Sequence, residues 1–170
     1  MRRWHLVAVG TAVALVLGLL VAAVVRDSAP GALPVVGKQA PALALPRLDG
    51  QGQVSSADWR GKPVVLNFWS SWCGPCRDEF SVLGRHAGRD DVVVVGVVFQ
   101  DSPDTARRFV DDVGARWPIG VDERSAAAIA YGVRGLPQTF LLDRDGVVAA
   151  VYTGPLSESA LAADLGRLTT

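Results

Sequence analysis

Two short runs of apolar, mostly β-branched residues constrain the fold of this chain most strongly. Residues 63–70 (Pro-Val-Val-Leu-Asn-Phe-Trp-Ser) and 91–100 (Asp-Val-Val-Val-Val-Gly-Val-Val-Phe-Gln) lack the alternation of apolar and polar side chains that a half-buried strand shows. A nearly continuous apolar run of this length is typical of a strand buried on both faces. Such a sheet needs helices on both sides to cover it, so the two runs predict an α/β fold.

The segments that follow these strands supply the covering helices. Residues 75–86 have helical length and one apolar stripe. Ser102 and Pro103 can cap and open a second helix, which Gly114 can end. The remaining predicted elements are a short helix at 123–131, a strand at 138–143, an Asp-Gly hairpin turn at 144–146, a strand at 147–152 and a last helix at 157–168. This order predicts an α/β sandwich with a central mixed β-sheet flanked by helices.

A run of 20 residues without a charge, from Leu6 to Val25, precedes this domain. At about 1.5 Å per residue it spans the roughly 30 Å hydrocarbon core of a bilayer, so it predicts one N-terminal transmembrane helix. Arg2 and Arg3 lie before it, and this positive-inside bias places the N-terminus in the cytoplasm and the folded domain outside. A cleaved signal peptide is the alternative, although the run exceeds the usual h-region of about 7–15 residues and no clear cleavage site follows.

The chain therefore divides into four predicted parts. Residues 1–5 are the cytoplasmic N-terminus, 6–25 the transmembrane anchor, 26–37 a linker rich in Pro, Gly and small residues, and 38–170 the folded domain. We expect the protein to be a single-pass protein of the cytoplasmic membrane, with its domain on the extracytoplasmic side.

Charge and cysteine content exclude several classes of protein. The chain has 17 basic and 17 acidic residues, and the part after residue 26 holds 14 basic and 17 acidic ones. No basic field of the kind that binds nucleic acid is therefore expected. Two cysteines are too few for the disulfide framework of a small secreted scaffold.

The two cysteines form a C-x-x-C pair, Cys73-Gly74-Pro75-Cys76, between a buried strand and a helix. Such a pair can be half of a zinc site, a structural disulfide or a redox dithiol. Zinc needs further Cys or His ligands, and only His5 and His86 remain; a structural disulfide over so short a loop restricts the unfolded chain little. The dipole at a helix N-terminus favours a thiolate, which supports the redox reading. We expect Cys73 to be exposed and to attack, and Cys76 to be shielded and to resolve the mixed disulfide.

Three motifs in order, Trp59-Arg-Gly-Lys-Pro63, Asn67-Phe-Trp-Ser-Ser-Trp-Cys-Gly-Pro-Cys-Arg-Asp-Glu-Phe80 and Gly132-Val-Arg-Gly-Leu-Pro-Gln-Thr-Phe-Leu-Leu-Asp143, give this sequence a family resemblance. Over residues 37–168 it resembles the thioredoxin superfamily, and more closely the membrane-tethered TlpA, ResA and CcmG (DsbE) branch. The resemblance implies a thioredoxin-like fold, a nucleophilic Cys73 and a resolving Cys76. It also implies a cis peptide bond before Pro137, with the residues around the dithiol binding substrate. That expected substrate-binding set is Trp72, Gly74, Pro75, Leu136 and Pro137, with Trp69 as either a further docking residue or part of the core.

Asn67 departs from thioredoxin, which has a buried aspartate at this position that exchanges protons with the resolving thiol. An amide cannot do so. The TlpA-like branch commonly has a glutamate in the active-site helix instead, and Glu79 matches it. Glu79 lies three residues after Cys76, so a helix puts both on one face, where a partly desolvated carboxyl group can act as acid and base toward Cys76. The alternative is an exposed Glu79 paired with Arg77 or another nearby arginine.

The resemblance implies an anchored thiol–disulfide oxidoreductase that needs no metal or cofactor. We expect it to reduce protein disulfides, such as the heme-site cysteine pair of apocytochrome c, and to be re-reduced by a membrane electron donor of the CcdA or DsbD type. A general extracytoplasmic reductase or oxidase is an alternative. A non-catalytic copper-delivery module is another, although copper carriers of this fold usually have a C-x-x-x-C pair and a distal His, and this chain has neither.

Overall fold

The computed structural model describes residue 16 and residues 36–169. Within these described residues no helix is both long and apolar enough to cross a membrane. The predicted anchor, residues 6–25, lies outside them except for Val16, and so does most of the predicted linker. The anchor and the linker therefore remain predictions, and the description below concerns the domain from residue 36 onward.

The core of the domain is a five-stranded mixed sheet with the order β5-β4-β3-β6-β7. β3 pairs in parallel with β4, and β4 with β5, whereas β6 is antiparallel to both β3 and β7. The strands are β3 (Val64–Trp69), β4 (Val93–Phe99), β5 (Ile119–Asp122), β6 (Gln138–Leu142) and β7 (Val148–Thr153). All six residues of β3 are buried, which confirms the prediction of a central strand covered on both faces.

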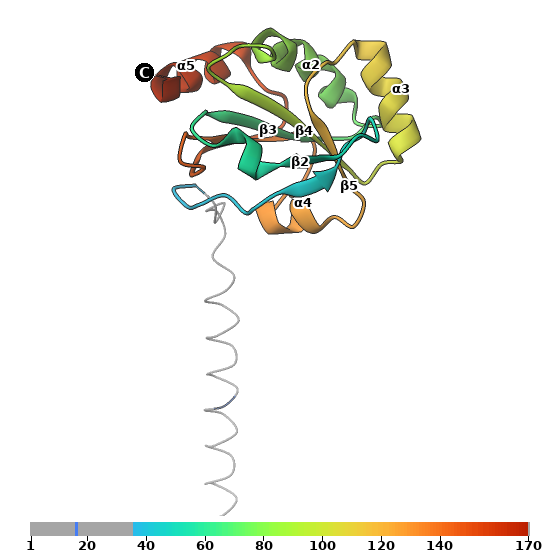
Figure 1. The fold of residues 1–170 in the computed structure, drawn as a ribbon, viewed down its shortest axis with the longest axis horizontal. Helices are drawn as coiled ribbons and strands as arrows, with labels where there is room; N and C mark the ends of the chain where they lie inside the picture. Colours follow the sequence, from blue (N-terminus) through green and yellow to red (C-terminus); the bar gives the residue numbers. More distant parts are fainter. Residues whose placement is uncertain (1–15, 17–35, 170) are drawn as a thin grey trace, which may run out of the picture. The chain divides into compact units, whose positions relative to one another are not determined.

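Helices cover both faces of this sheet, as Figure 1 shows, with α2, α3 and α5 on one side and α4 on the other. The helices are α2 (Gly74–His86), α3 (Pro103–Val113), α4 (Ala126–Tyr131) and α5 (Glu158–Thr169). Side chains of β3 alternate between the two faces: Val65 and Trp69 pack beneath α2, α3 and α5, while Leu66 and Phe68 pack toward α4. The predicted mixed sheet flanked by helices is confirmed.

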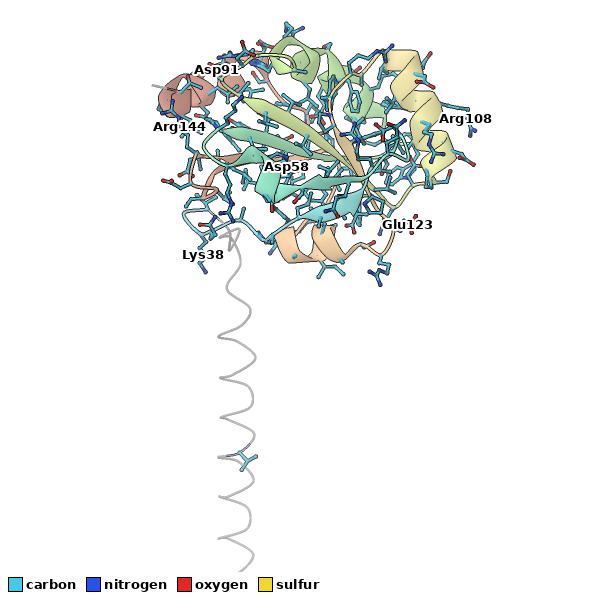
Figure 2. All side chains as sticks on the ribbon, viewed as in Figure 1. Lys38, Asp58, Asp91, Arg108, Glu123 and Arg144 are labelled. Atoms are coloured by element: carbon cyan, nitrogen blue, oxygen red, sulfur yellow. A yellow bond between two sulfur atoms is a disulfide. The ribbon has the colours of Figure 1, made fainter. Side chains whose placement is uncertain are left out.

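Local sequence signals fix the ends of α3 as expected. The hydroxyl group of Ser102 accepts a hydrogen bond from the backbone N–H of Thr105 at 3.1 Å, and Pro103 stands in the first turn. Gly114 ends the helix in the left-handed conformation, with φ of 68°. Most charged side chains of the domain lie at its surface, Asp91, Arg108, Glu123 and Arg144 among them, as labelled in Figure 2, whereas Glu79 and Asp122 are buried.

A small sheet that the sequence analysis did not predict precedes β3. It pairs β1 (Ala44–Pro46) with β2 (Gln53–Ser55), followed by the 3-10 helix η1 (Ser56–Trp59). Strands of three residues are too short to show a periodic pattern. The sheet packs against β5 through Leu45, whose Cβ would lie 2.9 Å from a Cβ at Gly120. The missing side chain of Gly120 is what allows this close approach.

Candidate active site

Cys73 and Cys76 lie where β3 passes into α2, and they form a disulfide with a Cα–Cα distance of 5.3 Å. Cys73 is the N-cap residue of α2 and Pro75 stands in its first turn, where a missing N–H costs nothing. Cys76 is fully buried, as predicted, but Cys73 is only 5% exposed. The expectation of an exposed Cys73 is therefore wrong in this disulfide form, because the side chain belongs to the buried core cluster that also contains Trp69 and Phe80.

The loop before Cys73 is held by the residues that follow β4. The backbone N–H of Ser71 donates to Asp101 Oδ2 at 2.7 Å, and the indole N–H of Trp72 donates to the carbonyl oxygen of Gln100 at 2.9 Å. Parallel pairing of β3 and β4 brings their carboxyl ends together at this edge of the sheet. The Trp72 side chain nevertheless remains 62% exposed, and Gly74 and Pro75 beside it are exposed too.

The bond between Leu136 and Pro137 is cis, as predicted. Pro137 directly precedes β6, whose Gln138 pairs with Phe68 of β3, so Pro137 reaches the level of Trp69 at the carboxyl end of β3. Leu136 packs against the core cluster that contains both cysteines. The expected substrate-binding residues therefore gather around the start of α2. Trp69 does not join them: it is fully buried between Phe80 and Phe109, with ring centroids 4.9 and 5.0 Å away.

An open groove lies beside this loop, between α2 and α3. Its volume is about 410 Å³, and its wall combines cationic, hydroxyl and aromatic groups. It is lined by Ser71, Arg77, Thr105, Arg108, Phe109 and Asp112.

Glu79 is 1% exposed and lies one helical turn after Cys76 on α2. Its Oε1 accepts from Asn67 Nδ2 at 2.7 Å, and its Oε2 accepts from the backbone N–H of Leu156 at 3.2 Å. Burial raises the pKa of Glu79 from 4.5 to about 7, and these two hydrogen bonds only partly oppose that rise. A carboxyl group with this pKa is able to take up and release a proton near neutral pH.

The alternative of an exposed Glu79 paired with an arginine is wrong. The guanidinium group of Arg77 points to the other side of α2, where it pairs with Asp112 at 2.6 Å and lies 4.8 Å from the centroid of the Phe109 ring.

Within the described residues, no three His, Cys, Asp or Glu side chains gather closely enough to hold a metal ion.

Asn67 and Thr139 belong to this site, although the sequence predicts a function for neither residue. Asn67 Nδ2 donates to Thr139 Oγ1 at 2.9 Å as well as to Glu79. The signal that could have found Asn67 is its position: it alternates with Val65 and Trp69 on β3 and so shares the face that α2 covers. Thr139 could not be found in this way, because its contact depends on the register between β3 and β6.

The chain is similar in sequence to proteins named as thiol–disulfide oxidoreductases. The family model described as AhpC/TSA family matches residues 36–151. The thiol:disulfide interchange protein HelX of Rhodobacter capsulatus is 35% identical over 141 residues, which are 80% of this chain and 79% of HelX. The thiol-disulfide oxidoreductase ResA of Bacillus subtilis is 34% identical over 128 residues, covering 74% of this chain and 71% of ResA.

Solved structures of proteins with similar names share the fold of this chain. A Chlorobium tepidum chain provisionally named thiol:disulfide interchange protein DsbE superimposes with a TM-score of 0.74 at 31% identity, covering 79% of this chain and 98% of that one. A secreted thiol-disulfide isomerase from Corynebacterium glutamicum gives a TM-score of 0.69 at 27% identity, covering 77% and 85% of the two chains.

The thioredoxin-like fold with a dithiol at the start of α2 thus defines a thiol–disulfide oxidoreductase. This chain belongs to the AhpC/TSA family and, within it, to the thiol–disulfide oxidoreductases of the DsbE, HelX and ResA type. The resemblance inferred from the three sequence motifs is confirmed.

Proposed function

We propose that this protein is an anchored, extracytoplasmic reductase of protein disulfides, with the heme-site cysteine pair of apocytochrome c as its substrate. The observation that carries the proposal is the burial of Glu79 one turn after the resolving cysteine of a helix-start dithiol. The resemblance to the TlpA, ResA and CcmG branch supports the apocytochrome substrate. The apolar run at 6–25 and the arginines before it support a single-pass anchor with the N-terminus inside.

The reaction begins with the reduced enzyme. The Cys73 thiolate, favoured by the N-terminus of α2, attacks one sulfur of the substrate disulfide. A bond forms between Cys73 and that sulfur, the substrate S–S bond breaks, and the other substrate sulfur leaves as a thiolate. The product of this first step is a mixed disulfide between Cys73 and the substrate.

The second step resolves the mixed disulfide. Cys76 gives its proton to the Glu79 carboxylate, and the Cys76 thiolate attacks the sulfur of Cys73. The Cys73–Cys76 bond forms, the bond to the substrate breaks, and the second substrate sulfur leaves as a thiolate that takes up a proton from Glu79 or water. The substrate has gained two electrons, and the enzyme is left in the disulfide form that the structure holds.

Return to the dithiol needs two electrons and two protons. A membrane dithiol donor of the CcdA or DsbD type supplies the electrons in this proposal, and an anchor keeps the domain within reach of such a donor. The Gly-Pro pair between the cysteines, which matches strongly reducing thioredoxin, supports reduction rather than oxidation as the net direction.

Substrate docking in this proposal uses the residues around the disulfide. Trp72, Gly74 and Pro75 are exposed on one side of it, and the half-buried Leu136 and the buried Pro137 lie on the other. A substrate cysteine in an extended segment would lie between them.

Substrate trapping tests this function. The Cys76→Ser chain, expressed in the native membrane, cannot resolve the mixed disulfide and should accumulate Cys73 bound to its substrate, whereas the matched Cys73→Ser chain should trap nothing. Capture of apocytochrome c supports the proposed substrate. Capture of many unrelated secreted proteins would instead identify a general reductase. Absence of any adduct, together with no reduction of a model disulfide, would contradict the enzyme and favour the copper-delivery alternative.

A further inference from the structure

Asn67 links the buried carboxyl group of Glu79 to the hydroxyl group of Thr139. Its amide nitrogen lies 2.7 Å from Glu79 Oε1 and 2.9 Å from Thr139 Oγ1. Asn67 and Thr139 are cross-strand partners in β3 and β6, and both are fully buried. The amide oxygen of Asn67 has no hydrogen-bond partner in the part of the chain that the structure describes. Buried amide oxygens are nearly always paired, so this one calls for an explanation.

Glu79 needs different neighbours in its two protonation states. A carboxylate only accepts hydrogen bonds, but a protonated carboxyl group also donates one through its O–H. The contacts of Glu79, Asn67 Nδ2 at 2.7 Å and the Leu156 N–H at 3.2 Å, are both donors. Neither can accept the O–H of a protonated Glu79. The arrangement seen in the structure therefore suits the carboxylate only.

We infer that the Asn67 amide reverses when Glu79 takes up a proton, so that Asn67 and Thr139 are positioning residues that hold Glu79 in both of its protonation states. A rotation of about 180° around the Cβ–Cγ bond exchanges the oxygen and nitrogen of the amide, which are nearly equal in size. The amide oxygen then accepts the O–H of Glu79. The hydroxyl group of Thr139, which can donate as well as accept, turns from acceptor to donor toward the same oxygen.

The reversal conserves the number of hydrogen bonds that Glu79 and Asn67 make, although the amide group that turns away from Glu79 still lacks a partner among the described residues. In the carboxylate state, Asn67 donates to Glu79 and to Thr139, and Leu156 donates to Glu79. In the protonated state, Glu79 and Thr139 both donate to Asn67, and Leu156 still donates to Glu79. Since neither state leaves a Glu79 oxygen unpaired, the carboxyl group can exchange a proton without moving away from the face it shares with Cys76.

Among the groups around Glu79, the Asn67 amide is the one that responds when Glu79 takes up a proton. Asn67 of β3, Thr139 of β6 and the Leu156 backbone are neutral, and on α2 the neighbouring Arg77 is paired with Asp112 at the surface. Glu158 of α5 is engaged by Arg85 and His86 at the far end of α2. In the disulfide form Cys76 does not titrate either. Proton uptake by Glu79 can therefore be followed there without interference from the thiols.

A pH titration by NMR tests the reversal on the full-length, isotope-labelled chain in its disulfide form. The Glu79 side-chain carbon reports the proton, and nuclear Overhauser effects from the Asn67 amide protons report which way the amide points. We expect the contact between these protons and Thr139 to be present when Glu79 is ionised and lost when it is protonated, with one shared midpoint. In Glu79→Gln, the control, the Asn67 signals should not change with pH. An Asn67 contact to Thr139 that persists through the Glu79 titration would overturn the inference.

An Asn67→Leu chain separates positioning from packing. Leucine removes both the donor and the acceptor, and because the hydrogen bond to the carboxylate is the stronger one, the Glu79 midpoint should rise by about one pH unit. A midpoint equal to that of the wild type would contradict a positioning role and leave Asn67 a merely structural residue. The inference rests on the proposed role of Glu79, but these titrations use no substrate. If substrate trapping fails, the titrations can therefore still be interpreted. If instead the Asn67 amide does not rotate, disulfide reduction by the enzyme is unaffected.

Discussion

The indole N–H of Trp72 donates a hydrogen bond to the backbone carbonyl of Gln100 at 2.9 Å, although Trp72 is 62% exposed. Gln100 directly follows the last residue of β4 and has a positive φ of 52°. The hydrogen bond to Gln100 thus orients the Trp72 ring, while most of the ring remains exposed to solvent. An oriented, exposed aromatic ring next to a reactive cysteine is suited to contact a protein substrate.

Replacing Trp72 should weaken the use of protein substrates and spare the chemistry. In Trp72→Ala we expect the KM for a protein disulfide to rise roughly tenfold, which corresponds to about 1.4 kcal/mol, while reduction of a small aromatic disulfide keeps its rate. Ile129→Ala is the matched control, because Ile129 is an exposed apolar residue on α4, on the other face of the sheet. Equal losses with both kinds of substrate would argue against docking.

Glu79 should make the folded domain less stable as pH rises. Its pKa is raised from 4.5 to about 7, so the folded state keeps a proton that the unfolded chain releases above pH 4.5. The wild type should therefore lose stability between about pH 4.5 and 7, by up to roughly 3 kcal/mol, and stay at the lower level above pH 7. Urea unfolding of the disulfide form measures this, and Glu79→Gln should lack the decline. Parallel pH profiles for the two chains would contradict the assignment.

Glu158 should contribute to stability by joining α2 to α5. Its carboxylate accepts from Arg85 Nε at 2.8 Å and lies 3.0 Å from Nε2 of the buried His86. Glu158→Ala leaves the His86 ring nitrogen unpaired inside the domain, which should cost about 1–3 kcal/mol in urea unfolding. Hydrogen bonding to Arg85 lowers the pKa of Glu158, so this contribution should be present above the unfolded pKa and fade in more acidic solution. Glu123→Ala, at an exposed position before α4, should cost almost nothing.

Two glycine-to-alanine substitutions should change the stability of the domain in opposite directions. Gly120→Ala places a Cβ 2.9 Å from Leu45 Cβ and should destabilise the domain by about 1–3 kcal/mol through overpacking. Gly84→Ala lies within α2, where the new Cβ makes an ordinary contact of 3.7 Å with the Trp117 ring. It should stabilise the domain by about 0.5–1 kcal/mol, because alanine loses less backbone entropy in a helix. Thermal unfolding compares the two, and a stable Gly120→Ala chain would show that β1 can shift.

The sequence predicted an element of the fold correctly where its apolar pattern was long or where a capping residue marked the start of a helix. The continuous apolar runs predicted β3 and β4, the Ser102-Pro103 pair predicted the start of α3, and the motif around Pro137 predicted its cis bond. The strand and helix signals lie within a few neighbouring residues, so they needed no knowledge of distant contacts, and the cis bond followed from the family resemblance.

Features that depend on contacts between distant segments escaped prediction. β1 and β2 are too short to carry a pattern, and they owe their place to contacts with β5. The burial of Cys73 follows from the packing of the whole cluster between β3 and α2. The contacts of Glu79 join residues 12 and 77 positions apart, Asn67 and Leu156, and only the folded register brings them together.

The pH dependence of mixed-disulfide resolution tests most directly whether Glu79 is the proton acceptor of Cys76. A stopped-flow measurement would follow release of a substrate thiol from Cys73 in the wild type and in Glu79→Gln. The rate in the wild type should rise with pH through a midpoint near 7, as Glu79 becomes a carboxylate. Glu79→Gln should lack this midpoint and react roughly 100-fold more slowly at neutral pH. Identical profiles and rates for the two chains would contradict the account.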